Sequence, residues 1–490
     1  MLLTAELLLN YQRCDRRAFL EAYGDRAYKA PPSDFLLKLR QDSALHQQQV
    51  LSTQTWQRPQ YPEHNWVAAA EATVELMRQG VDQIYQGVLL VESSGVSLLS
   101  KPSLLIKQAG LSDFGDWLYA PADIRLSKRP KLEYKVISAF HVQLLAEIQG
   151  AWPESAWLVL REKGRYAVDL WQSLPQMQSI LAALTEMIQQ QQEPEVFIAR
   201  NRCSLCPWFQ HCYEIAQSQQ HLSLLPGVTP SRYPALQQLE LTTVAALAKT
   251  DPTRLEHLPG FSNDAAIRLV QQAQAVHQNQ AIARMIQAAT NRQLLANLPT
   301  ASVELYFDIE AEPGLNLAYL HGVLVVDRQA GSQTFYPLMA EQPDGERLVW
   351  QQFLELVQRY PTAPIFHFCA YEVQTVERLA RLYHTPYSLV KPLLTRFFDL
   401  HLWVTETAAL PIESYTLKLI ARWLGFEWRD ADANGAQSIY WYSQWLQTGD
   451  RAFLEAILRY NEDDCRATYH VKEWLTSFIH TRQLKVVNVP

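Results

Sequence analysis

The sequence has few cysteines, no long apolar run and no excess of basic residues, and each absence excludes a class of protein. Six cysteines among 490 residues are too few for a disulfide-held secreted scaffold. No stretch approaches the ~20 apolar residues of a membrane span. The N-terminus MLLTAELLLNYQRCDRR lacks the basic start and the cleavage site of a signal peptide. The net charge of −7 argues against a protein that wraps nucleic acid through its overall charge. We expect a cytoplasmic protein without a membrane segment.

Length and residue patterning predict three regions. A chain of 490 residues is too long for one ordinary core. Residues 1–216 mix helical and strand patterns, whereas residues 217–298 turn to Ala, Leu and Gln at helical spacing. Residues 299–490 begin with strands and then alternate strands with helices. We therefore predict an α/β multidomain protein with a small helical connector.

Four of the six cysteines indicate a metal site that joins the two ends of the first region. Cys14 lies on an expected helix near the N-terminus, and CSLCPWFQHC supplies Cys203, Cys206 and Cys212 at the far end. The tight turn of C-x-x-C directs two sulfurs at one centre. Four thiolates suit a tetrahedral zinc or an iron-sulfur cluster, and both possibilities stay open. The remaining two cysteines fit scattered core positions.

A charged stretch between these cysteines is a second candidate site. In PADIRLSKRPKLEYKVISAF, Asp123 follows one expected strand, and Glu133 and Lys135 share a face of the next expected strand. Two carboxylates can hold a divalent metal, and an amine beside them can orient the attacking water. A hairpin with a solvated charged face is the alternative interpretation.

The cysteine placement and the order of the charged residues resemble the iron-sulfur nucleases of the RecB-like PD-(D/E)XK superfamily, such as the CRISPR-associated exonucleases. The resemblance covers roughly residues 1–216. It implies a restriction-endonuclease-like domain whose two ends are held together by the cysteine cluster, with 4Fe–4S favoured and zinc as the alternative. That family shows an early His, an Asp, then (D/E)-x-K and a Gln on the following helix. The matching positions in this sequence are His46, Asp123, Glu133, Lys135 and Gln143.

Two further segments are candidates for nucleic-acid contacts. Lys128, Arg129 and Lys131 lie on the expected turn after Asp123 and can contact phosphates, although an ordinary solvated turn explains them as well. In the connector, LPGFS at residues 258–262 separates two helical runs, and LLPGVTP is a weaker echo. Such a turn resembles helix-hairpin-helix modules, whose backbone N–H groups hold a DNA phosphate. A plain connector has the same pattern.

The last region opens with VELYFDIE, an apolar run that ends in two carboxylates. Because successive strand side chains alternate, Asp308 and Glu310 share one face while Phe307 and Ile309 face a core. Two neighbouring carboxylates repel each other unless a cation or a proton lies between them, so the pair favours a hard divalent metal. A solvated strand end is the alternative.

Three later segments supply partners for this pair. A short buried strand at residues 365–368 contains His367, an expected packing residue, and runs into a helix that begins near Glu372. Asp399 follows another apolar pair, as a further ligand or, preferentially, a supporting cap. On the last helix, Tyr460 and Asp464 are four residues apart and share a face.

This order of acids resembles the DEDD exonuclease group of the RNase H-like fold, in the variant with Tyr in its third motif. The resemblance covers roughly residues 300–478 and implies a mixed sheet with helices and a 3′–5′ exonuclease site. Asp308 and Glu310 match the first motif, and Tyr460 with Asp464 matches the third. Glu372 stands where that group usually has Asp, a change that keeps the charge and lengthens the side chain.

Phosphodiester hydrolysis needs charge stabilisation on both the attacking and the leaving oxygen, which two Mg²⁺ or Mn²⁺ ions about 4 Å apart provide. Oxygen ligands suit these ions. We therefore expect a metal-dependent nuclease with two potential active sites that acts on nucleic acid, DNA in preference to RNA. The alternative is a non-catalytic nucleic-acid-binding or adaptor protein in which both folds are relics.

Overall fold

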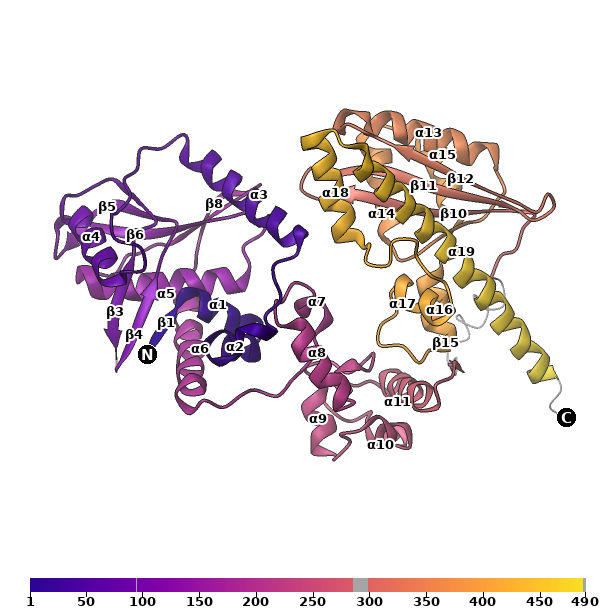
Figure 1. Cartoon of the computed structure of the whole chain (residues 1–490), viewed down its shortest axis with the longest axis horizontal. Coiled ribbons are helices and arrows are strands. Elements are labelled where there is room, and N and C mark those ends of the chain that lie inside the picture. The colour runs from indigo at the N-terminus through magenta and orange to yellow at the C-terminus, as the bar shows by residue number, and fades with distance from the viewer. Residues whose placement is uncertain (94, 285–297, 488–490) are drawn as a thin grey trace. The chain divides into compact units, whose positions relative to one another are not determined.

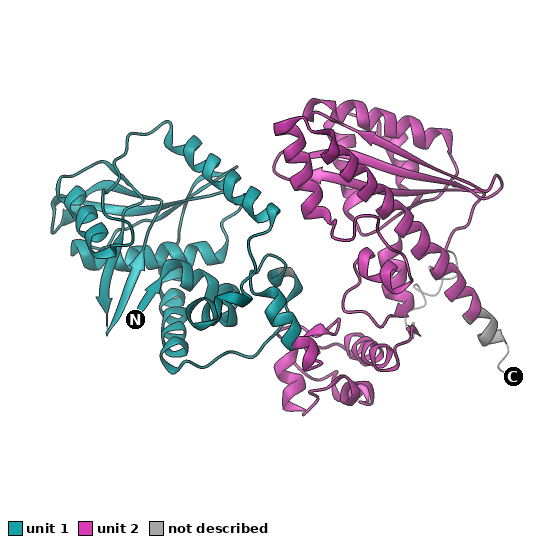
Figure 2. Ribbon diagram, in the orientation of Figure 1, with its two compact units in different colours: residues 1–215 teal, residues 216–490 magenta. Residues whose placement is uncertain are grey.

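The chain forms two compact units, Met1–Ile215 and Ala216–Pro490 (Figure 2). The computed structural model describes residues 1–93, 95–284 and 298–487. The helical segment after Ile215 therefore belongs to the same compact unit as the last region. The finer division into a connector and a C-terminal domain stays a prediction.

The first unit is built around a five-stranded sheet with strand order β2-β5-β6-β7-β8 (Figure 1). Helix α5 covers one face, where Val136 and Phe140 pack with Tyr119 of β6. The end of α3 covers the other face, where Leu51 packs against Ile124. A three-stranded sheet, β1-β4-β3, lies beside it. The elements of this unit are β1 (Leu2–Thr4), α1 (Ala5–Arg13), α2 (Asp15–Tyr23), α3 (Asp34–Leu51), α4 (Trp66–Arg78), β2 (Gln83–Tyr85), β3 (Leu89–Ser93), β4 (Val96–Ser100), β5 (Leu104–Ser112), β6 (Gly115–Arg125), α5 (Leu132–Gln149), β7 (Trp157–Leu160), β8 (Gly164–Ala167), α6 (Leu170–Gln190), α7 (Arg200–Cys203) and α8 (Phe209–Ser218), the last of which continues into the second unit.

The predicted strand carrying Glu133 and Lys135 is wrong, because both residues lie in the first turn of α5. Lys131 is the extended N-cap of this helix, directly after Pro130. The helix forms here because a nearly continuous apolar run begins at Val136 and is buried on most of its circumference against the sheet. Because β6 pairs with β5 and with the parallel strand β7, the chain leaves the sheet after β6 and crosses through α5 before β7.

The second unit contains the three antiparallel strands that the sequence predicts after residue 299, and this prediction is confirmed. Its sheet has the order β12-β11-β10-β13-β14, in which β10, β11 and β12 are antiparallel and β13 and β14 join in parallel. The remaining elements are helices around this sheet and in the connector, together with a small two-stranded sheet of β9 and β15 (Figure 1). The elements are α9 (Tyr233–Gln238), α10 (Val244–Ala248), α11 (Asn263–Gln278), β9 (Ile282–Ala283), β10 (Val303–Glu312), β11 (Leu317–Asp327), β12 (Ser332–Met339), α13 (Glu346–Arg359), β13 (Ile365–His367), α14 (Tyr371–Leu382), α15 (Tyr387–Leu394), β14 (Phe397–Asp399), α16 (Leu400–Thr407), β15 (Ala408–Ala409), α17 (Leu417–Trp423), α18 (Gly435–Thr448) and α19 (Arg451–Val487).

The central strand β10 is buried on both faces. Phe307 and Ile309 pack with Phe353 of α13 and its neighbours, as the strand alternation predicts. Tyr306 faces the opposite side, among side chains of α16, α17 and α19. Asp308 has the same parity as Tyr306, so the acidic end of the strand points toward α19.

The connector contains both predicted glycine turns. Gly227 and Gly260 have φ angles of 96° and 82°, a backbone region that favours glycine. Arg232 donates to the carbonyl oxygens of both residues, at 2.9 Å and 2.8 Å. The two turns are therefore held side by side, and contact with a phosphate stays a prediction.

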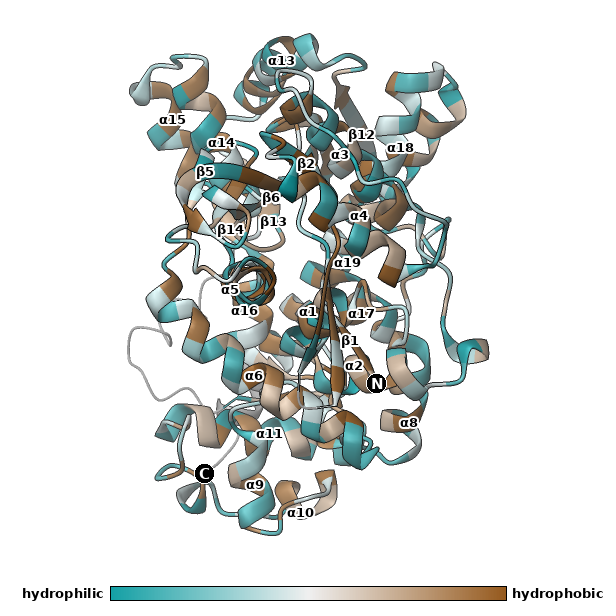
Figure 3. Ribbon diagram, turned by 90° about the vertical axis from the view of Figure 1, so that its left-hand side faces the viewer, coloured by the Kyte–Doolittle hydropathy of each residue, from teal (hydrophilic) through white to brown (hydrophobic). Residues whose placement is uncertain are grey.

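Polar and apolar segments alternate along the helices of both units (Figure 3). Among the described residues, no helix combines the length and the apolar character needed to cross a membrane. Helices such as α13 and α14 bury one side, whereas α5 is buried on most of its circumference.

Candidate metal centre

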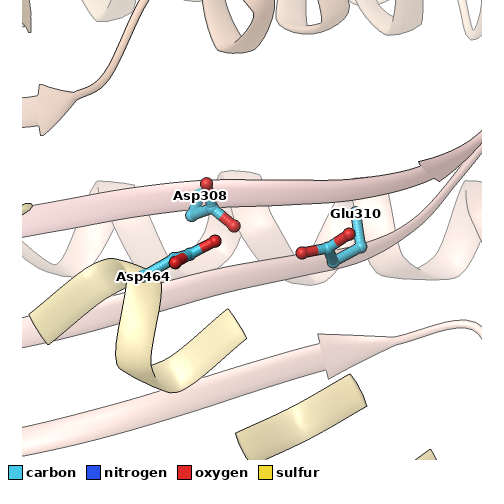
Figure 4. A group of neighbouring side chains, drawn as sticks. All are labelled: Asp308, Glu310 and Asp464. Carbon is cyan, nitrogen blue, oxygen red and sulfur yellow. The ribbon is translucent and has the colours of Figure 1, made fainter. Parts of the chain in front are cut away.

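Strand β10 and helix α19 bring three carboxylates together at one point (Figure 4). Asp308 and Glu310 project from the same face of the strand, and Asp464 projects toward them from the helix. One oxygen from each carboxylate lies within 4.8 Å of the others. Within residues 1–93, 95–284 and 298–487, this is the one set of three acidic, His or Cys side chains with that spacing. The predicted pairing of the first and third motifs is thus present in the structure.

The three carboxylates lie in a poorly solvated environment. Glu310 is 6% exposed and Asp464 is 9% exposed. Burial raises the pKa of Glu310 to about 8, with the charge of Asp464 adding to it, and burial raises the pKa of Asp464 to about 7. The pKa of Asp308 is raised well above its usual value by burial and by both neighbouring carboxylates.

A cation between these carboxylates would stabilise their charged forms and so lower the pKa values that burial and mutual repulsion raise. None of the three forms an ion pair with a basic side chain of the described residues. Buried carboxylates are normally paired or coordinate a metal. The donor set, three carboxylate groups, fits a hard divalent ion such as Mg²⁺ or Mn²⁺.

Hydrogen bonds from neutral side chains fix the orientation of each carboxylate. Asn461 donates its Nδ2 to Asp308 Oδ2 at 2.6 Å, and Trp428 donates its Nε1 to Asp464 Oδ1 at 2.8 Å. Ser438 hydrogen-bonds to Glu310 and lies 2.6 Å from the hydroxyl of Tyr319. Such partners hold metal ligands in place and tune their affinity.

Sequence analysis missed Asn461, although a signal was present. Asn461 follows Tyr460 in YNEDD and lies three residues before Asp464, which places it on the same side of α19. It is fully buried, and its Oδ1 lies against Gly322, the residue paired with Asp308 across the sheet. A Cβ atom on Gly322 would lie 1.7 Å from that oxygen, so the glycine makes room for the amide.

Tyr460 stays protonated at this site. Burial raises the pKa of its phenol, and the carboxylates of Asp464, Glu310 and Asp308 raise it further. The phenol hydrogen-bonds to Asp464. A neutral phenol among carboxylates can donate hydrogen bonds but cannot act as a base.

Glu372 lies beside the three carboxylates but outside the 4.8 Å set. It is 4% exposed in the first turn of α14, and its charge contributes to the raised pKa values of Asp308 and Glu310. Its own pKa is raised by burial, while His367 at 3.4 Å opposes the rise. His367 is buried on β13, as expected of a packed strand residue, and also contacts Glu372.

Asp399 caps a helix and holds the turn that precedes Glu372. Its Oδ1 accepts hydrogen bonds from the backbone N–H groups of His401 and Cys369, both at 2.9 Å. Cys369 has a φ angle of 76°, an uncommon conformation for a residue other than glycine. Asp399 therefore stabilises a strained turn, which agrees with the supporting role expected for it.

In the first unit, Asp123 is not arranged as an open metal ligand. It is 2% exposed on β6, where Arg125 binds its Oδ2 at 2.8 Å and His141 lies 3.2 Å from the same atom. Its Oδ1 accepts from the backbone N–H of Ser103 at 3.1 Å. Nearby Arg125 and His141 outweigh burial and hold the pKa of Asp123 well below its usual range.

The contacts of the other residues predicted for this second site are with other partners. Glu133 pairs with Arg13 at 2.7 Å, and the Lys135 ammonium lies 5.5 Å from the ring of Tyr166. Gln143 accepts from Gln178 of α6 at 3.4 Å. The residue of α5 that reaches Asp123 is His141. His46 lies on α3, where burial lowers the pKa of its partly covered ring.

The four predicted cysteines of the first unit lie near one another. Cys14 is the extended residue between α1 and α2 rather than part of a helix. Burial raises the pKa of its thiol to about 11, and Cys203 and Cys206 add to the rise. The pKa of Cys212 is raised by burial, and Cys206 adds to the rise, whereas a hydrogen bond from Arg16 lowers it. No three of these sulfurs lie within 4.8 Å of one another.

A family model of the RNase H superfamily matches residues 305–476. The match includes most of β10, the elements that follow it, most of α19, and the carboxylates of the second unit described above. The prediction of an RNase H-like C-terminal region is confirmed. No curated protein matches the chain.

Proposed function

We propose that the RNase H-like region at residues 305–476 hydrolyses phosphodiester bonds of nucleic acid with two divalent metal ions and releases nucleotides from 3′ ends. The observation that carries this proposal is the set of three poorly solvated carboxylates within 4.8 Å. None of them forms an ion pair with a basic side chain of the described residues, although the charge of nearby Lys418 lowers the pKa of Asp464. Burying three carboxylates together costs free energy of folding unless a cation binds between them.

The residues have separate roles in this proposal. Asp308, Glu310 and Asp464 hold the metal ions, and Glu372 completes the acidic set from α14. Bound Mg²⁺ or Mn²⁺ supplies charge stabilisation on the phosphate oxygens and a lowered pKa of water. Tyr460 donates its O–H to Asp464, and its phenol oxygen accepts a hydrogen bond from the attacking water and so orients it.

The neutral partners of the carboxylates keep this arrangement in place before substrate binds. Asn461 and Trp428 each donate one hydrogen bond to a carboxylate, so the acids do not rotate toward solvent. Preorganised ligands avoid a reorganisation cost during the reaction. Asp399 acts indirectly, through the turn that positions Glu372.

The four cysteines of the first unit are proposed to hold an iron-sulfur cluster. With Zn–S bonds of about 2.3 Å, the sulfurs around a tetrahedral zinc would be about 3.8 Å apart. The sulfurs here are grouped, but no three of them lie within 4.8 Å of one another. This spacing supports a cluster of several atoms, and a colourless protein with one zinc per chain would refute it.

The test of the hydrolytic proposal is nucleotide release from single-stranded DNA labelled at its 3′ end or its 5′ end. We expect Mn²⁺-dependent release that starts at the 3′ label, and a loss of at least 100-fold in Asp308→Asn. Glu355→Gln is the matched control, because Glu355 is an exposed acid of α13 on the other face of the sheet. RNA oligonucleotides of the same sequence establish the substrate preference.

Equal rates in wild type, Asp308→Asn and Glu355→Gln would refute the site assignment. Strand binding without any metal-dependent release would instead support the alternative, a binding or adaptor protein.

A further inference from the structure

An exposed basic surface lies on the first unit, beside Asp123. It combines the loop between β6 and α5 with the turn between β7 and β8. We call it the basic patch and define it by six exposed residues: Lys128, Arg129, Lys131, Arg161, Lys163 and Arg165.

The two segments of the patch are in contact. The backbone N–H of Arg161 donates to the carbonyl of Ser127 at 3.4 Å, and Lys128 pairs with Glu162 at 2.6 Å. The predicted nucleic-acid contacts on the β6–α5 loop are therefore joined by a second set of basic residues, about 30 positions later in the chain.

Positive charge predominates in the patch although the whole chain carries −7. The loop and the turn contain one acidic residue, Glu162, which pairs with Lys128 of the patch, and the nearby Glu133 in the first turn of α5 pairs with Arg13. A local excess of positive charge is typical of a surface that binds a polyanion.

Aromatic rings are interleaved with the basic residues. The Arg165 guanidinium lies 3.7 Å from the ring centre of Trp157, and Tyr134 lies near both Lys131 and Arg125, at 5.7 Å and 4.9 Å. Rings beside basic side chains offer stacking as well as charge, a combination that suits single-stranded nucleic acid better than an acidic protein.

The carboxylate of Asp123, next to the patch, forms an ion pair with Arg125. The Arg125 guanidinium lies 2.8 Å from one oxygen of Asp123 and 4.9 Å from the ring centre of Tyr134. A divalent ion at Asp123 would have to displace this guanidinium and would meet its positive charge.

We infer that the first unit binds the phosphate backbone of single-stranded nucleic acid through the basic patch and does not cut it. This inference goes beyond the proposed hydrolysis by the second unit. It requires neither a metal ion nor a reaction at Asp308.

The test is binding of a fluorescent single-stranded oligonucleotide by the full-length protein in EDTA, where no metal-dependent cleavage occurs. We expect the triple variant K128Q/R129Q/K131Q to bind at least tenfold more weakly at 50 mM salt. With a slope of about 0.7 per phosphate contact, the dependence of log K on log salt should fall by about 2. The matched control R26Q/R58Q/R78Q removes three exposed basic residues of the same unit outside the patch and should bind within twofold of wild type.

Equal weakening by the two triple variants would overturn the patch assignment, and so would stronger competition by an acidic peptide than by the unlabelled oligonucleotide. A second arm measures Mn²⁺-dependent cleavage in D308N/E310Q. Absence of cleavage supports a first unit that does not cut, whereas residual cleavage that disappears on adding Asp123→Asn would overturn it. Because the binding arm excludes metal, failure of the hydrolytic proposal leaves its result unaffected.

Discussion

Without metal, the second unit is expected to lose stability as the pH rises from 5 to 8. Burial raises the pKa of Glu310 from 4.5 to about 8 and that of Asp464 from 3.8 to about 7. Between these values the folded protein holds protons that the unfolded chain has released. The stability contributed by these groups is therefore complete below about pH 4 and is lost as the pH rises through 7 to 8.

The size of the expected loss of stability can be worked out from Asp464 alone. The raised pKa of Asp464 corresponds to about 4 kcal/mol, of which roughly 3 kcal/mol falls between pH 5 and pH 8. In a unit of this size, each kcal/mol moves the melting temperature by about 2 to 4 °C. The expected decrease is thus roughly 6 to 12 °C.

Differential scanning calorimetry in EDTA at pH 5 and pH 8 measures this decrease. The transition of the second unit is recognised because Mn²⁺ at pH 8 should raise it. Asp464→Asn should flatten the pH dependence and melt higher than wild type at pH 8, whereas Glu355→Gln should behave like wild type. A wild-type transition that is equally stable at both pH values, or that the Asn variant does not change, would refute the reasoning.

Three other substitutions test the surroundings of the site. Asn461→Ala should lower metal-dependent activity by about 10- to 100-fold, because Asp308 loses its fixed hydrogen bond, and Mn²⁺ titration of activity measures the weaker binding. Gly322→Ala should lower the free energy of unfolding by about 1 to 3 kcal/mol, because the added Cβ collides with the Asn461 amide. The loss should be smaller when Asn461 is also replaced by Ala. His321→Leu should raise the free energy of unfolding by roughly 1 to 3 kcal/mol in urea titrations, because neither ring nitrogen of this fully buried His has a hydrogen-bond partner among the described residues. A decrease would show that the ring packs better than leucine.

The C-terminal site was largely predictable because its chemistry is local to regular elements. Alternation along β10 places Asp308 and Glu310 on one face, and helical spacing places Tyr460 with Asp464. The sequence does not show which residues hold these carboxylates. Ser438 comes from α18, and its contact with Glu310 depends on how that helix packs.

The first unit was less predictable at Glu133 and Lys135. An E-x-K spacing puts two side chains on one face of a strand but about 200° apart on a helix. The apolar run from Val136 onward decides for the helix, since α5 buries that run against the sheet. The partners of Asp123 are a near neighbour on its own strand and a His one element later, and neither spacing signals a closed carboxylate in advance.

Electron paramagnetic resonance counts the bound Mn²⁺, and nucleotide release is measured on the same samples. Together they test directly whether the three carboxylates hold the metal ions that hydrolysis requires. We expect two Mn²⁺ ions per chain in wild type, a loss of at least one ion in Asp308→Asn, and nucleotide release that decreases with this loss. Unchanged Mn²⁺ binding in Asp308→Asn, or full nucleotide release without bound metal, would contradict it.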